Sequence, residues 1–474
     1  MNGNRRTNIL FLTDDEHRWD FYTGGLIDGL QTPAVDRLKR MGVTFSNAFS
    51  NCPVCMPTRF TWLTGLYASQ SPSGPRNAKD WPCGHKTVAH ALQRAGYETA
   101  IIGKLHSHCG RTMAGRHLSE FEKRARERGF DYVFECQGAK TRSRYTDYII
   151  EKHGEEFYEK MVEDVASRDH RIGGTNLYSP SFLPTEDRQD VFIADEVVRW
   201  LSERSSGKPF FLHASFTGPH FPHDPPEPYF SRYGPGDMPP PVGVDDPREL
   251  KYWREQRAAY CGKIEHIDYL IGRILDAVEA NGLLDNTIIV FSSDHGDMMG
   301  DHHLFYKIHP YDASIRTPTI VYDPSSKRPG GTVLTDMVEA VDIPATFLEV
   351  GTDEHLQDAM PTSLARSFLK YARGAVNSHR EWAYCEHGNF CEEGARVYRL
   401  ARDREWKFVF YEKGNMLFNI REDPFEQNNL VDDESQMTRV NEMQARIIRR
   451  MGEMMVPPES LETNVPIEFY KGVL

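Results

Sequence analysis

The sequence predicts an α/β fold: a mostly parallel sheet with helices on both faces, followed by a smaller antiparallel α+β region. Two patterns lead to this prediction. Short apolar runs alternate along the chain with segments whose apolar residues recur at helical spacing, which is typical of a parallel sheet between helices. Polar residues also follow several of the apolar runs, and ligand sites of such sheets lie at the carboxyl ends of the strands.

Four apolar runs are short enough to be buried strands. They cover residues 8–13, 99–102, 209–216 and 287–291. Chemically active side chains follow three of them: Asp14 and Asp15, Lys104 and His106, and Asp294 and His295. Because the carboxyl ends of parallel strands share one edge of the sheet, we expect these side chains to meet there.

Three segments between the predicted strands show the apolar spacing of a helix, at residues 87–95, 191–201 and 260–278. Gly96 is a stop signal for the first of these helices. Residues 219–247 are rich in proline and predict a long irregular loop.

The pattern changes after about residue 366. Short strands separated by turns are predicted at 395–402, 407–411 and 416–420, and an amphipathic helix is predicted at 434–454. We therefore divide the chain into a main α/β domain at residues 1–365 and a smaller C-terminal α+β subdomain at residues 366–474.

The composition is that of an ordinary globular protein, with 39% hydrophobic and 26% charged residues. The 474 residues include 56 Lys and Arg and 69 Asp and Glu, which leaves a formal net charge of −13. This negative surplus argues against non-specific binding to nucleic acid or to an anionic membrane. The sequence contains no run of about 18 apolar residues, so it predicts no membrane-spanning helix. The polar N-terminus shows no signal peptide, which predicts a cytoplasmic location, and the eight cysteines are sparse enough to be reduced thiols.

Cys55 begins a segment whose side chains could take part in catalysis, Cys55-x-Pro57-x-Arg59. Pro57 is compatible with the first turn of a helix, which would place Cys55 at the helix N-terminus, where the dipole favours negative charge. Taken alone, these residues are equally compatible with a buried core cysteine and a surface cation. Cys52 and Cys55 also form a C-x-x-C pair. No second close pair completes a zinc site, and Pro53 and Pro57 do not fit a thioredoxin-like helix.

Cys55-x-Pro57-x-Arg59, followed by Thr64-Gly65, resembles the signature of the sulfatase family in the alkaline phosphatase superfamily. Other segments resemble further family motifs in the expected order, at residues 8–15, 96–106, 219–222, 293–307 and 423–430. The resemblance covers nearly the whole chain. It implies the alkaline phosphatase-like α/β sandwich, with residues 1–365 as the catalytic domain, and the hydrolysis of a sulfuric ester.

In this family the cysteine is oxidised after translation to formylglycine, and a hydroxyl of the hydrated aldehyde is the nucleophile. The resemblance implies this role for Cys55, after modification by a formylglycine-generating enzyme. It implies one divalent metal ion, held by Asp14, Asp15, Cys55, Asp294 and His295. The other catalytic residues that it implies are Arg59 beside the nucleophile, Lys104 and Lys307 on the sulfate oxygens, His220 at the leaving group, and His106 as the acceptor of the proton whose removal expels sulfate.

The residue types fit a metal site independently of the resemblance. Asp14, Asp15 and Asp294 offer hard oxygen ligands, and three converging carboxylates would repel one another without a cation. Taken alone, the Asp14-Asp15 pair favours a solvated turn or a helix cap, and its position after an apolar strand, with Asp294 and His295 after another, favours the metal site instead. His295 stands where asparagine is commonest in the family, an arrangement that resembles some sulfatases and the phosphonate monoester hydrolases. Calcium is the expected ion, and the imidazole also admits manganese, with magnesium as a further alternative.

Other functions remain alternatives at this point. A phosphonate monoester or phosphodiester hydrolase with the same nucleophile is the first, which His295 favours and the Asp14-Asp15 pair opposes. A non-catalytic binding protein is opposed by the complete set of polar residues, since unused buried charge is costly. A thiol oxidoreductase is the last. The expected substrate is a small-molecule or carbohydrate sulfate ester, whose alcohol portion depends on loops that the sequence does not define.

Overall fold

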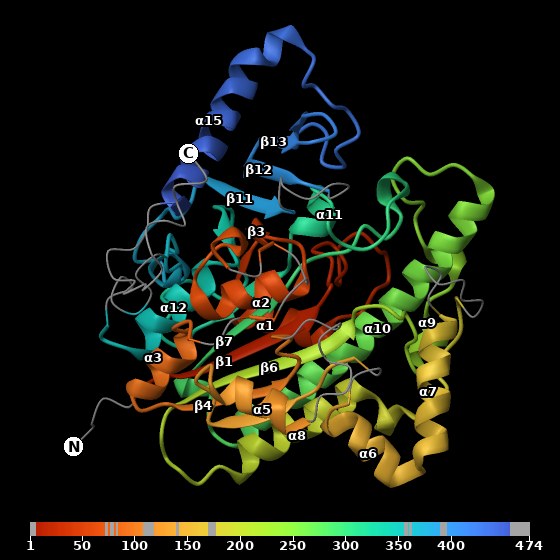
Figure 1. Ribbon diagram of the computed structural model, residues 1–474, viewed down its shortest axis with the longest axis vertical. Coiled ribbons are helices and arrows are strands. Elements are labelled where there is room, and N and C mark those ends of the chain that lie inside the picture. The colour runs from red at the N-terminus through yellow and green to blue at the C-terminus, as the bar shows by residue number, and fades with distance from the viewer. Residues whose placement is uncertain are drawn as a thin grey trace, which may run out of the picture.

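An eight-stranded sheet with the order β5-β4-β6-β1-β7-β8-β2-β9 is the centre of the computed structural model (Figure 1). The structure describes residues 6–71, 74–75, 80–81, 84–107, 118–138, 142–168, 177–354, 359, 363–388 and 396–455. The strands of the sheet are β1 (Asn8–Asp15), β2 (Val43–Phe45), β4 (Glu98–Gly103), β5 (Tyr132–Glu135), β6 (Phe210–Pro219), β7 (Thr287–Ser293), β8 (Thr319–Tyr322) and β9 (Thr332–Leu334).

Most neighbours in this sheet run parallel, which confirms the predicted class. β1 lies between β6 and β7 and is parallel to both, and β4 is parallel to β5 and β6. β8 is the exception and pairs antiparallel with β7 and β2. A separate two-stranded sheet joins β3 (Ala48–Phe49) to β10 (Val338–Glu339).

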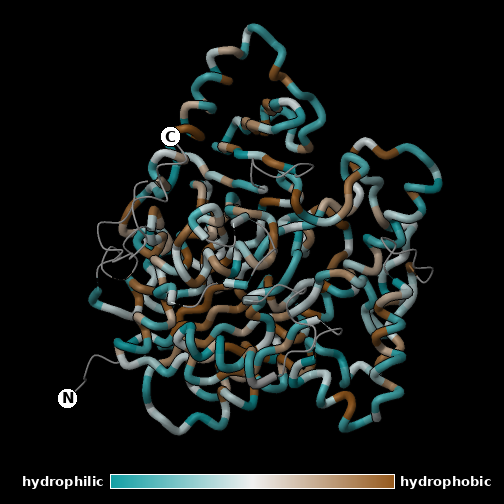
Figure 2. The backbone as a smooth tube through the Cα atoms, in the orientation of Figure 1, coloured by the Kyte–Doolittle hydropathy of each residue, from teal (hydrophilic) through white to brown (hydrophobic). Residues whose placement is uncertain are grey.

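Side chains of the central strand β1 alternate between two hydrophobic cores. Ile9 and Phe11 belong to one core, and Leu10 and Leu12 belong to the other. This period of two is the geometry of an extended strand. The hydrophobic residues are concentrated along these central strands (Figure 2). The same alternation decides where the polar residues at the end of β1 point.

Each core is completed by its own group of helices. Phe60, Leu92 and Phe347 pack in the first core with Ile9 and Phe11. The described helices that contribute to this core are α2 (Cys55–Thr64), α3 (Val88–Arg94), α5 (Leu118–Arg126), α12 (Asp342–Gly351) and α14 (Leu369–Ala372). Those of the second core are α1 (Pro33–Met41), α6 (Arg144–His153), α7 (Glu155–Ser167), α8 (Gln189–Glu203) and α10 (Pro247–Ala280). No described helix has an apolar stretch long enough to cross a membrane.

The predicted helices are present, and α10 is longer than its apolar stripe indicates. It begins at Pro247 rather than near residue 260, because Asp246 caps it by accepting hydrogen bonds from the backbone N–H groups of Arg248 and Glu249. The predicted proline-rich loop therefore ends where this cap begins. It also contains two short helices, α9 (Tyr229–Arg232) and a 3₁₀ helix at Pro235–Asp237.

The C-terminal region forms a four-stranded antiparallel sheet of β11 (Trp382–His387), β12 (Tyr398–Asp403), β13 (Trp406–Tyr411) and β14 (Met416–Asn419). The final helix α15 (Met437–Met455) packs on it, with Met443 and Ile447 in one cluster with Ala401 and Phe408. This confirms the predicted antiparallel α+β region, to which β11 is an addition. The division between residues 365 and 366 stays a prediction.

A buried ion pair joins this C-terminal region to the main sheet. Asp342, in the first turn of α12, accepts a hydrogen bond from Nε of Arg380 at 2.7 Å, two residues before β11. It also accepts from the backbone N–H groups of Glu339 and Arg366. Burial alone would raise the pKa of Asp342, but Arg380 outweighs it and holds this pKa well below its usual range.

We predict that Asp342→Ala lowers the free energy of unfolding by about 3–5 kcal/mol, because it leaves the Arg380 guanidinium buried without its carboxylate. The measurement is urea denaturation followed by tryptophan fluorescence. The control is Arg449→Ala, which removes an exposed i,i+4 pair with Glu453 on α15 and should cost no more than about 0.5 kcal/mol. Equal effects of the two substitutions would contradict the prediction.

Candidate active site

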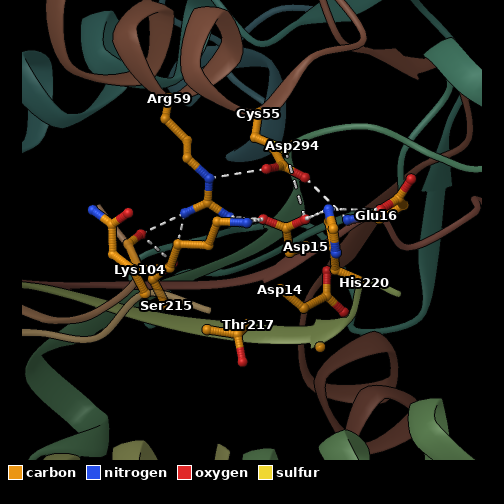
Figure 3. A network of polar contacts seen from close by, with 12 residues as sticks. Asp14, Asp15, Glu16, Cys55, Arg59, Lys104, Ser215, Thr217, His220 and Asp294 are labelled. Atoms are coloured by element: carbon orange, nitrogen blue, oxygen red, sulfur yellow. Dashed lines mark hydrogen bonds and ion pairs between the residues drawn. The ribbon is translucent and has the colours of Figure 1, made fainter. Parts of the chain in front are cut away.

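The predicted site residues converge at the edge of the sheet where β1, β4, β6 and β7 end (Figure 3). This confirms the expectation that the carboxyl ends of the strands form the site. The structure brings together Asp15, Cys55, Arg59, Lys104, His106, His220, Asp294, His295 and Lys307. Of the predicted set, Asp14 is absent from this group.

Cys55 is the first residue of α2, as its spacing from Pro57 predicts. Val54 precedes it in extended conformation, and Gly65 ends the helix in the left-handed region at φ 66°. Every residue of α2 is buried. A helix buried on all sides has no apolar stripe, which is why periodicity alone does not reveal it.

The thiol of Cys55 lies among cationic and imidazole groups. Its Sγ is 3.1 Å from Nζ of Lys307 and 3.2 Å from Nε2 of His295, and it is hydrogen bonded to His106. Burial raises the pKa of this thiol, but Lys307, Lys104 and His295 outweigh burial and hold it well below its usual range. The position of Sγ therefore favours a negatively charged atom.

Arg59, one turn after Cys55, holds two carboxylates of the site apart. Its Nε donates to Oδ2 of Asp294 at 2.9 Å, and its Nη2 donates to Oδ2 of Asp15 at 2.8 Å. Nη1 donates to the hydroxyl of Ser215 at 2.8 Å and to the carbonyl of Lys104. With a relative exposure of 1%, this guanidinium positions the acidic groups.

Asp14 lies at the end of β1 outside the tightest group of donor atoms, and its role as a metal ligand stays a prediction. Asp14 Oδ2 lies 2.6 Å from Nδ1 of His17, whose other ring nitrogen bonds the carbonyl of Phe21. Its Oδ1 is buried without a hydrogen-bond partner among the described residues. A carboxylate held by one oxygen in this way keeps the other oxygen for a cation.

Glu16 is a further acidic residue of the site, and the sequence analysis missed it. The residue is buried, with a left-handed φ of 69°. Its Oε2 lies 3.1 Å from Nζ of Lys307 and 3.2 Å from Nε2 of His220, and its N–H donates to Oδ1 of Asp294. Its Oε1 is buried without a hydrogen-bond partner among the described residues. The available signal was the third consecutive acidic residue after an apolar run.

Lys104 and His106 follow β4 directly. Gly103 ends that strand at φ 103°, where a Cβ would lie 1.9 Å from the carbonyl oxygen of Ser215, so only glycine fits. This close approach places Nζ of Lys104 2.5 Å from Oδ2 of Asp15. Burial lowers the pKa of His106 to about 4, which keeps its imidazole neutral.

His220 follows β6 and lies beside Asp15, with 32% of its side chain exposed. Its Nδ1 lies 2.7 Å from the carbonyl of Phe221 and donates to it. Nε2 therefore faces the site, 3.2 Å from Glu16. This arrangement presents one ring nitrogen of His220 to a group that enters from solvent.

A divalent cation fits the donor set of this site. Ligand atoms of Asp15, Cys55, Asp294 and His295 all lie within 4.8 Å of one another, and those of Asp15, Glu16 and His220 form a second such group. Burial and Asp15 raise the pKa of Asp294 to about 6 against the opposing effect of His295 and Arg59, as expected where carboxylates are crowded together. Oε1 of Glu16 has no hydrogen-bond partner among the described residues, so this oxygen is available to bind a metal ion.

His295 is oriented as a ligand. Its Nδ1 donates to the carbonyl of Gly296 at 2.9 Å, which directs Nε2 toward Cys55 and Asp294. Burial lowers the pKa of His295, but Asp294 outweighs burial and raises it to about 9. A bound cation would therefore replace a proton at this nitrogen.

Cys52 does not join the site. It is fully buried beside Val54 and Ala68, and burial raises its pKa well above the usual range. The five cysteines in the described part of the chain are all buried free thiols: Cys52, Cys55, Cys136, Cys261 and Cys385. The geometry thus opposes a redox function for the C-x-x-C pair.

Comparison with known proteins agrees with this site. The sulfatase family model matches residues 6–352, and a model described as "N-sulphoglucosamine sulphohydrolase, C-terminal" matches residues 300–453. An arylsulfatase of Clostridium perfringens is 29% identical over 94% of both chains. A multifunctional alkaline phosphatase superfamily protein of Trinickia caryophylli is 29% identical over 90% of this chain and 92% of its own.

Solved structures share the fold. A phosphonate monoester hydrolase of Silicibacter pomeroyi superposes with a TM-score of 0.80 at 24% identity, covering 95% of this chain and 96% of its own. The family match spans most of the chain and includes the cluster around Cys55. The chain therefore belongs to the sulfatase family of the alkaline phosphatase superfamily and is a hydrolase acting on sulfuric ester bonds.

Proposed function

We propose that this hydrolase cleaves a sulfate monoester with a formylglycine nucleophile derived from Cys55 and one divalent metal ion. The observation that carries the proposal is the position of Cys55 Sγ, buried at the start of α2 and in contact with Lys307 and His295. When formed, the hydrated formylglycine supplies one hydroxyl that attacks sulfur and a second that drives sulfate out. Sγ of Cys55 stands in for the attacking oxygen in this structure.

Lys104 and Lys307 bind the oxygens of the ester. The ammonium group of Lys104 lies against Asp15, and that of Lys307 contacts Glu16 and Cys55. Fixed cations in a water-excluded site stabilise charge that develops on the sulfate oxygens in the transition state. Arg59 contributes by holding Asp15 and Asp294 in place.

Two histidines handle the protons. His106 is neutral because burial lowers its pKa to about 4, and it is hydrogen bonded to Cys55, so it accepts the proton whose loss expels sulfate. His220 presents Nε2 on the more open side of the site and assists the leaving oxygen. The two roles follow from position, because His106 contacts Cys55 and His220 lines the adjoining cavity.

Asp14, Asp15, Asp294 and His295 would hold the metal ion, with the modified side chain of residue 55 as a further ligand and Glu16 beside it. A divalent cation there lowers the pKa of the nucleophile and neutralises the carboxylates. We propose calcium, because the carboxylates are hard oxygen ligands. Manganese is the alternative that His295 favours, and magnesium is a third outcome of the reconstitution described below.

The substrate that we propose is a small-molecule or carbohydrate sulfate ester, and maturation requires a formylglycine-generating enzyme. A choline-sulfatase of Rhizobium meliloti and a protein named an ulvan-active sulfatase of Formosa agariphila are both among the relatives. Their names cover a small alcohol and a polysaccharide. We also propose a cytoplasmic location.

We predict that Cys55→Ala lowers kcat for aryl sulfate hydrolysis at least a thousandfold, because it removes the nucleophile. The protein is produced together with a formylglycine-generating enzyme, and mass spectrometry of the peptide that contains residue 55 reports the conversion. Cys52→Ala is the matched control and should keep activity within about threefold, because Cys52 lies outside the site. Near-normal turnover by Cys55→Ala would contradict the mechanism.

The ester class is tested with one chromogenic alcohol carried on a sulfate monoester and on a phosphonate monoester. We expect kcat/KM to favour the sulfate ester by at least about tenfold, since differential transition-state binding determines this ratio. A ratio in favour of the phosphonate would replace the sulfatase by the alternative hydrolase. The Asp14-Asp15 pair favours the sulfatase and His295 favours the phosphonate hydrolase, so this measurement decides between them.

The ligand set is tested at two neighbouring acidic residues. Asp14→Asn and Glu16→Gln should each weaken calcium affinity at least about tenfold, because each removes a charge beside the ion. Calorimetric titration of chelator-treated protein with calcium, manganese or magnesium measures both. Unchanged affinity in Asp14→Asn would contradict its assignment as a ligand, and unchanged affinity in Glu16→Gln would remove Glu16 from the ligand set.

A further inference from the structure

A cavity of about 440 Å³ adjoins the reacting position. His220 and Lys307 belong to its lining, and Nζ of Lys307 lies 3.1 Å from Sγ of Cys55. An ester with its sulfate group on residue 55 would therefore extend its alcohol portion into this cavity. The other lining residues indicate the chemistry of that alcohol.

Arg396 is the one arginine among the described residues that line the cavity. Its Nη1 lies 2.7 Å from Nε2 of His309, and it forms no ion pair within the described ranges. Burial and Arg396 lower the pKa of His309 to about 3, so this ring is neutral and does not balance the guanidinium charge. No aspartate or glutamate is found among the described lining residues.

The structure holds Arg396 in place from its backbone. Its carbonyl accepts a hydrogen bond from Nδ1 of His387 at 2.6 Å, and the ring of His387 stacks on Tyr398. The hydroxyl of Tyr398 donates to the carbonyl of His309 at 3.1 Å. The cation and its neutral neighbour are thus fixed relative to each other before a ligand arrives, which reduces the entropy cost of binding.

The cavity also has an aromatic wall. Phe305 is 36% exposed, and its ring packs on Trp253 with centroids 4.5 Å apart. Leu304 and Ile308 lie beside it in the lining. His303 adds no available charge, because its Nδ1 is paired with Glu249 at 2.8 Å. The aromatic face of Phe305 and the guanidinium of Arg396 together fit a ligand that has a ring and a negative charge.

We propose that the substrate is a sulfate ester of a ring alcohol that bears a second anionic group, which Arg396 binds while Phe305 contacts the ring. A planar guanidinium pairs in the same way with a carboxylate or with a second sulfate group. The proposal rests on the proposed function, because it defines the ligand as the alcohol portion of the ester at Cys55. Arg396 is then a specificity-determining residue supplied by the C-terminal region.

The kinetic test uses nitrophenyl sulfates that carry a carboxylate, a carboxamide or a second sulfate on the ring. We expect the wild-type enzyme to prefer an anionic ring over the carboxamide at least about tenfold in kcat/KM. Arg396→Gln should lower kcat/KM for the anionic rings about 10–100-fold and for the carboxamide less than about threefold, as for a lost charge-assisted hydrogen bond. The anionic ring with the larger loss identifies the group that Arg396 binds.

Two further variants separate specificity from structure. Arg396→Lys should restore part of the preference, because it keeps the charge, and Arg421→Gln, which changes an exposed arginine after β14, should match the wild type. An equal loss on all three substrates in Arg396→Gln would overturn the proposal, since it would show a structural role. An absence of any preference for the anionic rings in the wild type would overturn it as well.

A binding measurement separates this proposal from the hydrolytic mechanism. Calorimetry measures the affinity of the carboxylated nitrophenyl sulfate for Cys55→Ala, which does not turn it over, with and without Arg396→Gln. At least about tenfold weaker binding in the double variant is expected. Unchanged affinity would overturn the assignment of Arg396. Weaker binding combined with no hydrolysis by the matured enzyme would contradict the proposed function alone.

Discussion

The buried guanidinium of Arg59 is the interaction on which the rest of the site depends. It binds Asp294 through Nε and Asp15 through Nη2, and these carboxylates come from the ends of two neighbouring strands, β1 and β7. Without this cation the two carboxylates would repel each other in a medium of low dielectric constant. Because Arg59 lies one turn after Cys55 on α2, the same contact also fixes the start of that helix against the sheet. Nucleophile and acidic groups are therefore positioned by one side chain.

Strand geometry imposes a second constraint. Adjacent apolar residues of β1 alternate between two cores, so Asp14 and Asp15 meet different neighbours at the end of the strand. Asp15 pairs with Arg59, and Asp14 forms a buried contact with His17. Glu16 returns its side chain to the site because the strand has ended and its backbone has turned into the left-handed region.

The C-terminal region is more than a covering layer. It is tied to the main sheet through the buried contact of Asp342 with Arg380, and it brings Arg396 to a cavity whose catalytic residues come from the main sheet. A site divided in this way separates two tasks. The main sheet holds the groups that act on the sulfate, and the segment next to β12 contacts the group to which the sulfate is attached. Such a division allows specificity to change without disturbing the reacting atoms.

The sequence by itself determined the fold class, the positions of four main strands and most of the polar residues of the site, because alternation, helical spacing and the position of polar residues after strands are local properties. It also placed Cys55 at a helix N-terminus from Pro57 alone. It did not determine which of Asp14, Asp15 and Glu16 face the nucleophile, since that depends on where β1 stops and how the chain turns. Nor did it reveal α2 as a helix buried on all sides, or the meeting of Arg396 with Lys307, which lie 89 residues apart in the printed sequence. Those features are decided by tertiary packing, because they arise only when segments distant in the chain fill the same space.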